Sequence, residues 1–124
     1  MIRGEQRLCD YLQHILQSIE RIHQYTDHID QARFLADPMV QDAVIRNIEI
    51  VGEASHRIET QCPDFAASHP ELPLSFAYQM RNVVAHGYFK VDLEIVWKTI
   101  KTDLLELQTA VRHALTDLPG SGRK

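Results

Sequence analysis

Apolar residues recur at spacings of three and four along almost the whole chain, which is the period of an α-helix. Near the N-terminus they form one stripe: Leu8, Leu12, Ile15, Leu16, Ile19 and Ile22. Such a stripe has to be buried against other helices. No segment alternates apolar and polar residues as a half-buried strand does. The pattern therefore predicts an all-α fold, an antiparallel bundle of four to five helices.

Cap and turn residues set the expected helix ends. Asp37 followed by Pro38 is a strong start signal, because Asp caps a helix N-terminus and Pro suits the first helical position. Three prolines within 62–73 predict a loop there. Asp92 can cap the last helix. The long helices are expected at about 5–25, 37–60, 74–86 and 92–118, with a short helical turn over 30–35.

Length and charge limit the class of protein. With 124 residues the chain makes one domain, expected over 1–118, and Pro119 begins a tail over 119–124 that we expect to be disordered. The net charge of −4 argues against a broad non-specific nucleic-acid binder, but it allows an enzyme that needs one or two cations at a cleft. No apolar run is long enough to span a membrane, and the start lacks a signal-peptide pattern, so we expect a cytoplasmic protein.

Several familiar signatures are absent from the sequence. There is no glycine-rich phosphate loop, HExxH motif or Gly-x-Ser-x-Gly elbow. The seven His residues include no closely spaced pair, and Cys9 and Cys62 stand alone, so we expect neither a metal nor a cofactor. The two cysteines are interpreted as small, buried or half-buried thiols.

A glycine interrupts the second long helix. Gly52 costs about 1 kcal/mol relative to Ala in a helix interior, and such a glycine often marks the close approach of another element. The polar residues near it, Asn47 and Glu53, are therefore candidates for supporting a functional site.

The densest group of chemically active residues reads Arg-Asn-Val-Val-Ala-His-Gly-Tyr-Phe over 81–89. Arg81 can hold a phosphate with its planar fork, and His86 can transfer protons near neutral pH. Five residues of helix turn about 500°, which leaves these two side chains about 140° apart around the axis. Asn82 and His86, four apart, share a face. The side chains of one copy of this segment can converge on a ligand only if the helix end rearranges. We favour the alternative that a second copy of the chain completes the site. This predicts a homodimer with a composite site.

These residues allow RNA cleavage without a metal. His86 would take a proton from a ribose 2′-OH or give one to the leaving 5′-oxygen, and Arg81 would stabilise charge on the phosphate. Asn82 would orient His86 or the phosphate, and Tyr88 would donate a hydrogen bond to it. By spacing alone, Arg81 is equally a salt-bridge residue, and His86 equally a cation at a helix C-terminus.

The segment as a whole resembles the Arg-x4-His-x-Tyr motif of the HEPN superfamily, specifically the HepT-like toxins of MNT–HEPN toxin–antitoxin pairs. Three other stretches resemble, in the same order, that family's second-helix pattern, inter-helix loop and last-helix start: 41–54, 69–73 and 91–97.

This resemblance implies a homodimeric helical bundle with metal-independent endoribonuclease activity, in a type VII (MNT–HEPN) toxin–antitoxin system. It implies that Arg81 and His86 are the catalytic pair and that Asn82 is the polar residue after Arg. The implied partner is an MNT-type nucleotidyltransferase antitoxin that transfers AMP from ATP to Tyr88. The added phosphate and bulk would exclude RNA from the cleft.

The sequence also allows two other hypotheses of function. One is a non-catalytic helical binding module that partners a nucleotidyltransferase, which the acidic balance favours mildly. The other is a structural dimer in which Arg81 and His86 form interface salt bridges.

Overall fold

The computed structural model describes residues 2–86 and 92–118, and the side chains of 6–85 and 92–118. All regular secondary structure in those ranges is helical, which confirms the all-α prediction. The elements are α1 (Ile2–Thr26), α2 (Gln31–Leu35), α3 (Pro38–Gln61), α4 (Pro63–Ser68), α5 (Leu74–His86), α6 (Leu93–Lys101) and α7 (Asp103–Asp117). The expected break at 87–91 and the expected tail at 119–124 lie outside the described residues.

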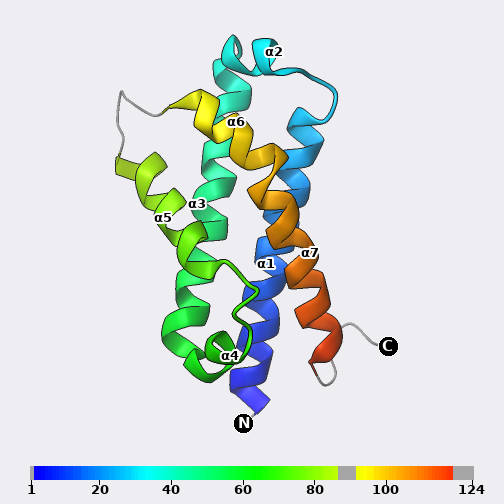
Figure 1. Cartoon of the computed structure of the whole chain (residues 1–124), viewed down its shortest axis with the longest axis vertical. Helices are drawn as coiled ribbons and strands as arrows, with labels where there is room; N and C mark the ends of the chain where they lie inside the picture. Colours follow the sequence, from blue (N-terminus) through cyan, green and yellow to red (C-terminus); the bar gives the residue numbers. More distant parts are fainter. Residues whose placement is uncertain (1, 87–91, 119–124) are drawn as a thin grey trace.

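The bundle is organised around α3. This helix packs against α1 on one side and α5 on the other, and α7 lies against α1. In Figure 1, α1 and α5 run upward while α3 and the α6–α7 pair run downward, so the long elements are antiparallel. The predicted stripe of α1 is fully buried at Leu12, Ile15, Ile19 and Ile22. The core therefore lies where the sequence periodicity places it.

Three of the helices begin with an aspartate N-cap, and two of these caps were predicted. Asp37 accepts a hydrogen bond from the backbone N–H of Val40 at 3.3 Å, with Pro38 as the first helical residue. Asp92 accepts from the N–H groups of Glu94 and Ile95 at 3.0 and 3.3 Å. Each cap satisfies backbone donors that a helix leaves unpaired at its start.

The predicted loop over 62–73 is wrong in part, because α4 occupies Pro63–Ser68. The presence of prolines does not exclude a helix that begins with one, since Pro63 sits in the first turn, where its missing N–H has no helical partner anyway.

The predicted continuous last helix is also divided. At Thr102 the backbone leaves helical geometry (φ −125°, ψ −69°), and the Thr102 hydroxyl donates to the carbonyl of Lys98 at 2.8 Å. A hydroxyl that bonds a carbonyl four residues back commonly bends a helix. The apolar stripe continues across this bend, so periodicity alone gave no sign of it.

Gly52 marks the crossing of α3 and α5, as predicted. A Cβ at this position would overlap Arg81 Cβ and lie 2.8 Å from the backbone oxygen of Ala77. The absence of a side chain at Gly52 lets the two helices touch, and it places the Cβ of Arg81 directly against α3.

Both cysteines are half-buried thiols, as interpreted from the sequence. Burial raises the pKa of the Cys62 thiol, and the nearby Arg7 opposes this rise only in part. Within the described ranges, no helix is long and apolar enough to cross a membrane.

Candidate active site

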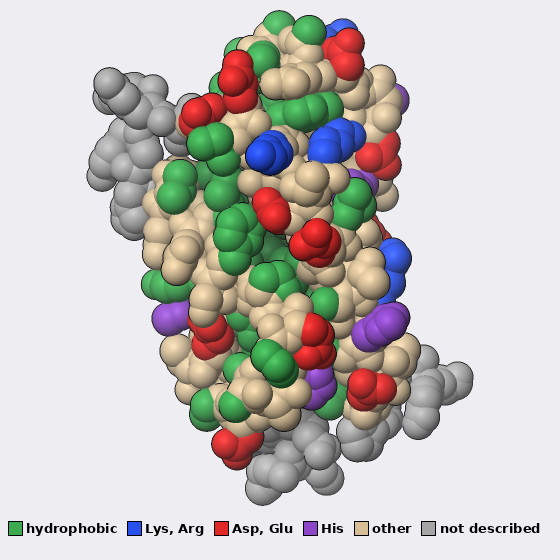
Figure 2. All heavy atoms as spheres, viewed as in Figure 1, with side chains coloured by type: hydrophobic (Ala, Val, Ile, Leu, Met, Phe, Trp, Pro, Cys, Tyr) green, Lys and Arg blue, Asp and Glu red, His purple; other side chains and the backbone are tan. Residues whose placement is uncertain are grey.

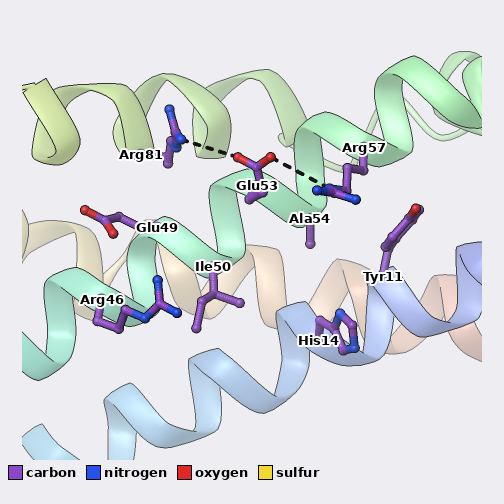
Figure 3. A pocket seen from close by; sticks show the side chains of 9 residues that line it. All are labelled: Tyr11, His14, Arg46, Glu49, Ile50, Glu53, Ala54, Arg57 and Arg81. Carbon is purple, nitrogen blue, oxygen red and sulfur yellow. Dashed lines mark ion pairs between the residues drawn. The ribbon is translucent and has the colours of Figure 1, made fainter.

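A pocket of about 410 Å³ lies where α1, α3 and α5 meet on the surface. Three arginines contribute to it, together with two glutamates (Figure 3). The full lining is Tyr11, His14, Arg46, Glu49, Ile50, Glu53, Ala54, Arg57 and Arg81. The pocket therefore joins one residue of the 81–89 motif to a polar row along α3.

Arg81 is held at this pocket from two sides. Its Nη1 donates to Asn82 Oδ1 at 2.9 Å, and its Nη2 lies 3.5 Å from Glu53 Oε1. About a third of the Arg81 side chain is exposed (31%), so the guanidinium still reaches solvent. With its Cβ fixed against Gly52 and its head group bonded twice, Arg81 is ordered before any ligand arrives.

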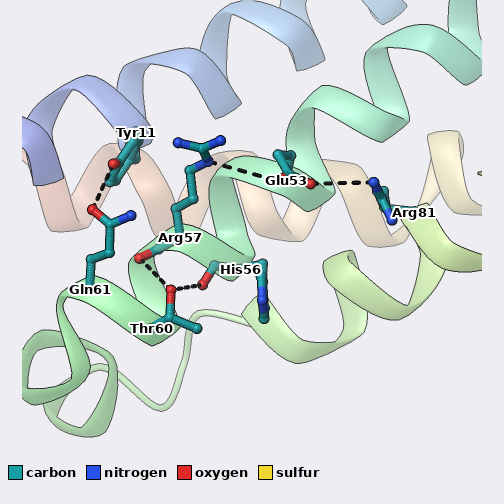
Figure 4. A network of polar contacts seen from close by, with 7 residues as sticks. All are labelled: Tyr11, Glu53, His56, Arg57, Thr60, Gln61 and Arg81. Carbon is teal, nitrogen blue, oxygen red and sulfur yellow. Dashed lines mark hydrogen bonds and ion pairs between the residues drawn. The ribbon is translucent and has the colours of Figure 1, made fainter.

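Glu53 bridges two arginines. Its Oε1 faces Arg81, and its Oε2 lies 3.7 Å from Arg57 Nε, one helical turn further along α3. Figure 4 shows the three side chains in a row, with Glu53 in the middle. The groups are 31–51% exposed, so each ion pair contributes at most about 1 kcal/mol. We therefore ascribe to this row an effect on geometry rather than on stability.

The two residues singled out near Gly52 are placed differently. Glu53 reaches Arg81, whereas Asn47 is buried on another side of α3 and does not line the pocket. The Asn47 amide donates to the carbonyl of Ala43 at 2.9 Å. No donor among the described residues reaches its Oδ1. Asn47 therefore makes no described hydrogen bond to the motif.

The Asn82 side chain accepts a hydrogen bond from its neighbour Arg81 at 2.9 Å. Helical spacing also places Asn82 on the same face as His86. His86 ends α5, and its side chain lies outside the described residues. Tyr88 lies outside them entirely. The arrangement of His86 and Tyr88 around Arg81 therefore stays a prediction.

Sequence reasoning missed Tyr11, His14, Arg46 and Arg57 as neighbours of the motif. Tyr11 donates to Gln61 Oε1 at 2.9 Å and thereby ties α1 to the end of α3 (Figure 4). Arg46 and Arg57 had a detectable signal, because with Glu53 they recur at spacings of seven and four on one face of α3. The α1 residues had none, since only tertiary packing brings them to the pocket.

The described side chains contain no group of three or more His, Cys, Asp or Glu that is able to hold a metal ion.

Comparison with known proteins places the chain among ribonucleases. A family model described as "Ribonuclease HepT-like" matches residues 15–114. The chain is 43% identical over 99 residues to "Probable ribonuclease HepT" of Thermococcus cleftensis, covering 80% of this chain and 87% of the relative. It is 35% identical over 101 residues to "Putative RNase MJ1380" of Methanocaldococcus jannaschii, covering 82% and 90%.

A third relative combines two activities in its name. "Gamma-glutamylcyclotransferase and putative RNase MJ0434" of Methanocaldococcus jannaschii is 36% identical over 108 residues, which cover 87% of this chain and 47% of that protein. No solved structure gives a significant match. On the family match and these identities, the chain belongs to the HepT-like ribonuclease family.

Proposed function

We propose that this protein is a metal-independent endoribonuclease and the toxin of a type VII (MNT–HEPN) toxin–antitoxin pair. The observation that supports this most is the restraint on Arg81. A guanidinium bonded by Asn82 and Glu53, yet still reaching solvent at a pocket, is suited to bind a phosphate diester.

The proposed reaction is an internal transesterification. The ribose 2′-oxygen attacks the adjacent phosphorus, the bond from phosphorus to the 5′-oxygen breaks, and a 2′,3′-cyclic phosphate forms. His86 takes the 2′-hydroxyl proton or supplies the proton that the leaving 5′-oxygen needs. Arg81 stabilises the negative charge that grows on the non-bridging oxygens.

This mechanism is tested by comparing RNA with DNA of the same sequence. The purified, unmodified protein is expected to cut a labelled single-stranded RNA in excess EDTA at the same rate as without EDTA. It is expected to leave the matched DNA intact, because DNA lacks the attacking 2′-hydroxyl. Loss of cleavage in EDTA, or equal cutting of DNA, contradicts the mechanism. RNA that stays intact while the protein binds a nucleotidyltransferase favours the non-catalytic binding module instead.

The proposed active form is a homodimer. Large apolar side chains remain exposed on neighbouring helices: Phe76 and Val83 on α5, Ile95 on α6 and Leu105 on α7. Figure 2 shows apolar side chains along the seam between α5 and the α6–α7 pair. A groove lined by Phe76, Met80 and Leu104 follows the same seam. Because α5 carries the motif, a second copy docked here places two motif-bearing helices side by side, while Arg81 itself faces the α1–α3–α5 pocket, about 200° around the helix from Val83.

A charge at the centre of this surface tests the dimer. Val83 is 55% exposed, so Val83→Asp is expected to leave the monomer folded while placing an uncompensated carboxylate in the interface. Light scattering after size-exclusion chromatography is expected to report a monomer with little ribonuclease activity. Gln24→Asp adds the same charge at an exposed position of α1, a helix that contributes no side chain to this groove, and is a control expected to remain dimeric. A Val83→Asp dimer with full activity places the interface elsewhere.

The proposed partner is an MNT-type nucleotidyltransferase antitoxin that transfers AMP to Tyr88. The tyrosyl oxygen would attack the α-phosphorus of ATP and release pyrophosphate. The attached phosphate would then compete with RNA for Arg81. Co-expression with the transferase is expected to add whole AMP units to the intact mass and to abolish RNA cleavage. Tyr88→Phe is expected to stay unmodified and active. AMP addition to this variant contradicts the assignment of Tyr88.

A further inference from the structure

Three guanidinium groups lie in sequence along the pocket. Arg46 and Arg57 are eleven residues apart on α3, which places them about 20° apart around the helix and about 16 Å apart along it. Arg81 packs at Gly52, about 9 Å along α3 from the level of Arg46 and about 7.5 Å from that of Arg57. The proposed catalytic arginine therefore lies near the middle of a row of three arginines, and the carboxylates of Glu49 and Glu53 line the same pocket.

The outer arginines are available to a ligand. Arg46 is exposed, and no described carboxylate lies within ion-pair distance of it. Figure 3 shows the Glu49 carboxylate pointing away from the Arg46 guanidinium. Arg57 is half exposed (51%), and its contact with Glu53 at 3.7 Å uses only the Nε edge. Its terminal nitrogens keep donors for another acceptor.

The spacing of the row fits a nucleic-acid strand. A strand stacked as in a duplex rises about 3.4 Å per phosphate along the helix axis and so covers 16 Å in about five nucleotides, while a more extended single strand covers it in fewer. Guanidinium groups bind phosphate oxygens with two parallel hydrogen bonds. Acidic side chains of a protein would satisfy the same donors, but the row passes through Arg81, whose proposed ligand is a phosphate diester. This continuity favours RNA over an acidic protein.

We propose that this pocket binds the RNA strand on both sides of the scissile linkage, with Arg46 and Arg57 each holding one flanking phosphate. The proposal rests on the ribonuclease function proposed above and adds to it a binding groove that runs along α3. The substrate is then a single strand of at least a few nucleotides, bound through its backbone.

The salt dependence of binding tests the groove. In a His86→Ala background, the affinity for a fluorescein-labelled twelve-nucleotide RNA is measured by anisotropy across a range of NaCl concentrations. Removing one phosphate contact is expected to weaken binding roughly tenfold at low salt, and to reduce the slope of log K against log [NaCl] by about 0.7. Arg46→Gln is the main variant, because Arg46 takes part in no described ion pair.

Arg112→Gln is the matched control. Arg112 is similarly exposed (57%) and lies on α7, where it faces Glu20 at 3.9 Å, outside the pocket. The Arg112→Gln substitution removes the same charge as Arg46→Gln, and it is expected to leave the slope of log K against log [NaCl] unchanged. In the active protein, Arg46→Gln is expected to raise KM for the twelve-nucleotide RNA while leaving cleavage of a dinucleotide unchanged.

The outcomes separate this proposal from the function on which it rests. If Arg46→Gln and Arg112→Gln give equal affinities and slopes, the groove proposal is wrong, even when the wild-type protein cleaves RNA. If the wild-type protein cleaves no RNA but Arg46→Gln alone reduces the slope, the ribonuclease proposal fails and the groove stands as an RNA-binding site. An equal effect of Arg46→Gln on the dinucleotide contradicts a role restricted to flanking phosphates.

Discussion

Replacing Arg81 by Ala is expected to lower kcat for RNA cleavage by roughly 10²–10³-fold, the usual effect of removing a preorganised group that stabilises transition-state charge. The guanidinium is fixed by Asn82 at 2.9 Å and Glu53 at 3.5 Å, so its donors need no reordering when charge develops on the phosphate. Initial rates on a labelled RNA at saturating concentration measure the loss directly.

The structure provides controls that separate catalysis from folding. The Arg81→Ala variant retains the Cβ that packs at Gly52, and Glu53 retains its ion pair with Arg57. The free energy of unfolding is therefore expected to change by less than about 1 kcal/mol. Arg81→Lys keeps the charge but loses the planar fork, and it is expected to recover only part of kcat. Glu53→Gln is expected to lower kcat less than Arg81→Ala does. Wild-type kcat in a folded Arg81→Ala dimer contradicts a role for Arg81 in the reaction.

Replacing Gly52 by Ala is expected to lower the free energy of unfolding by about 2–3 kcal/mol, although Ala is the better helix former. The new Cβ overlaps Arg81 Cβ and meets the backbone oxygen of Ala77 at 2.8 Å, and neither moves unless α5 shifts as a whole. Urea unfolding followed by circular dichroism gives the change in stability. The displaced α5 is also expected to reduce RNA cleavage, because Arg81 moves with it.

A substitution at an exposed alanine is the control for this effect. Ala67 is exposed on α4, and Ala67→Leu is expected to change the free energy of unfolding by less than about 0.5 kcal/mol. A Gly52→Ala protein that is more stable than wild type, by the helix-propensity gain of about 1 kcal/mol, means that α3 and α5 do not touch at this position.

Local signals in the sequence were enough for most of the fold. Asp37, Pro38 and Asp92 fixed helix starts because their effects act within one turn. Gly52 predicted a close approach but not which helix approaches. The helix at Pro63–Ser68 and the bend at Thr102 were missed because each depends on how a few backbone groups are satisfied, which apolar periodicity does not record.

The site was predictable only where its residues are close in sequence. The 81–89 motif and Glu53 were identified, but the hydrogen bond between the adjacent residues Arg81 and Asn82 was not, because helical spacing points to partners three or four residues away. Arg46 and Arg57 look like a solvated helix face until α1 and α5 are placed around them. Convergence from three helices is a tertiary property, and no local pattern encodes it.

The proposed composite site requires Arg81 of one protomer to act with His86 of its partner. Arg81→Ala and His86→Ala chains carrying different tags are co-expressed, and the mixed dimer is purified through both tags. One of its two composite sites then keeps both groups, so about half of the wild-type rate is expected, while each variant homodimer is inactive. A mixed dimer as inactive as the two homodimers contradicts the shared site.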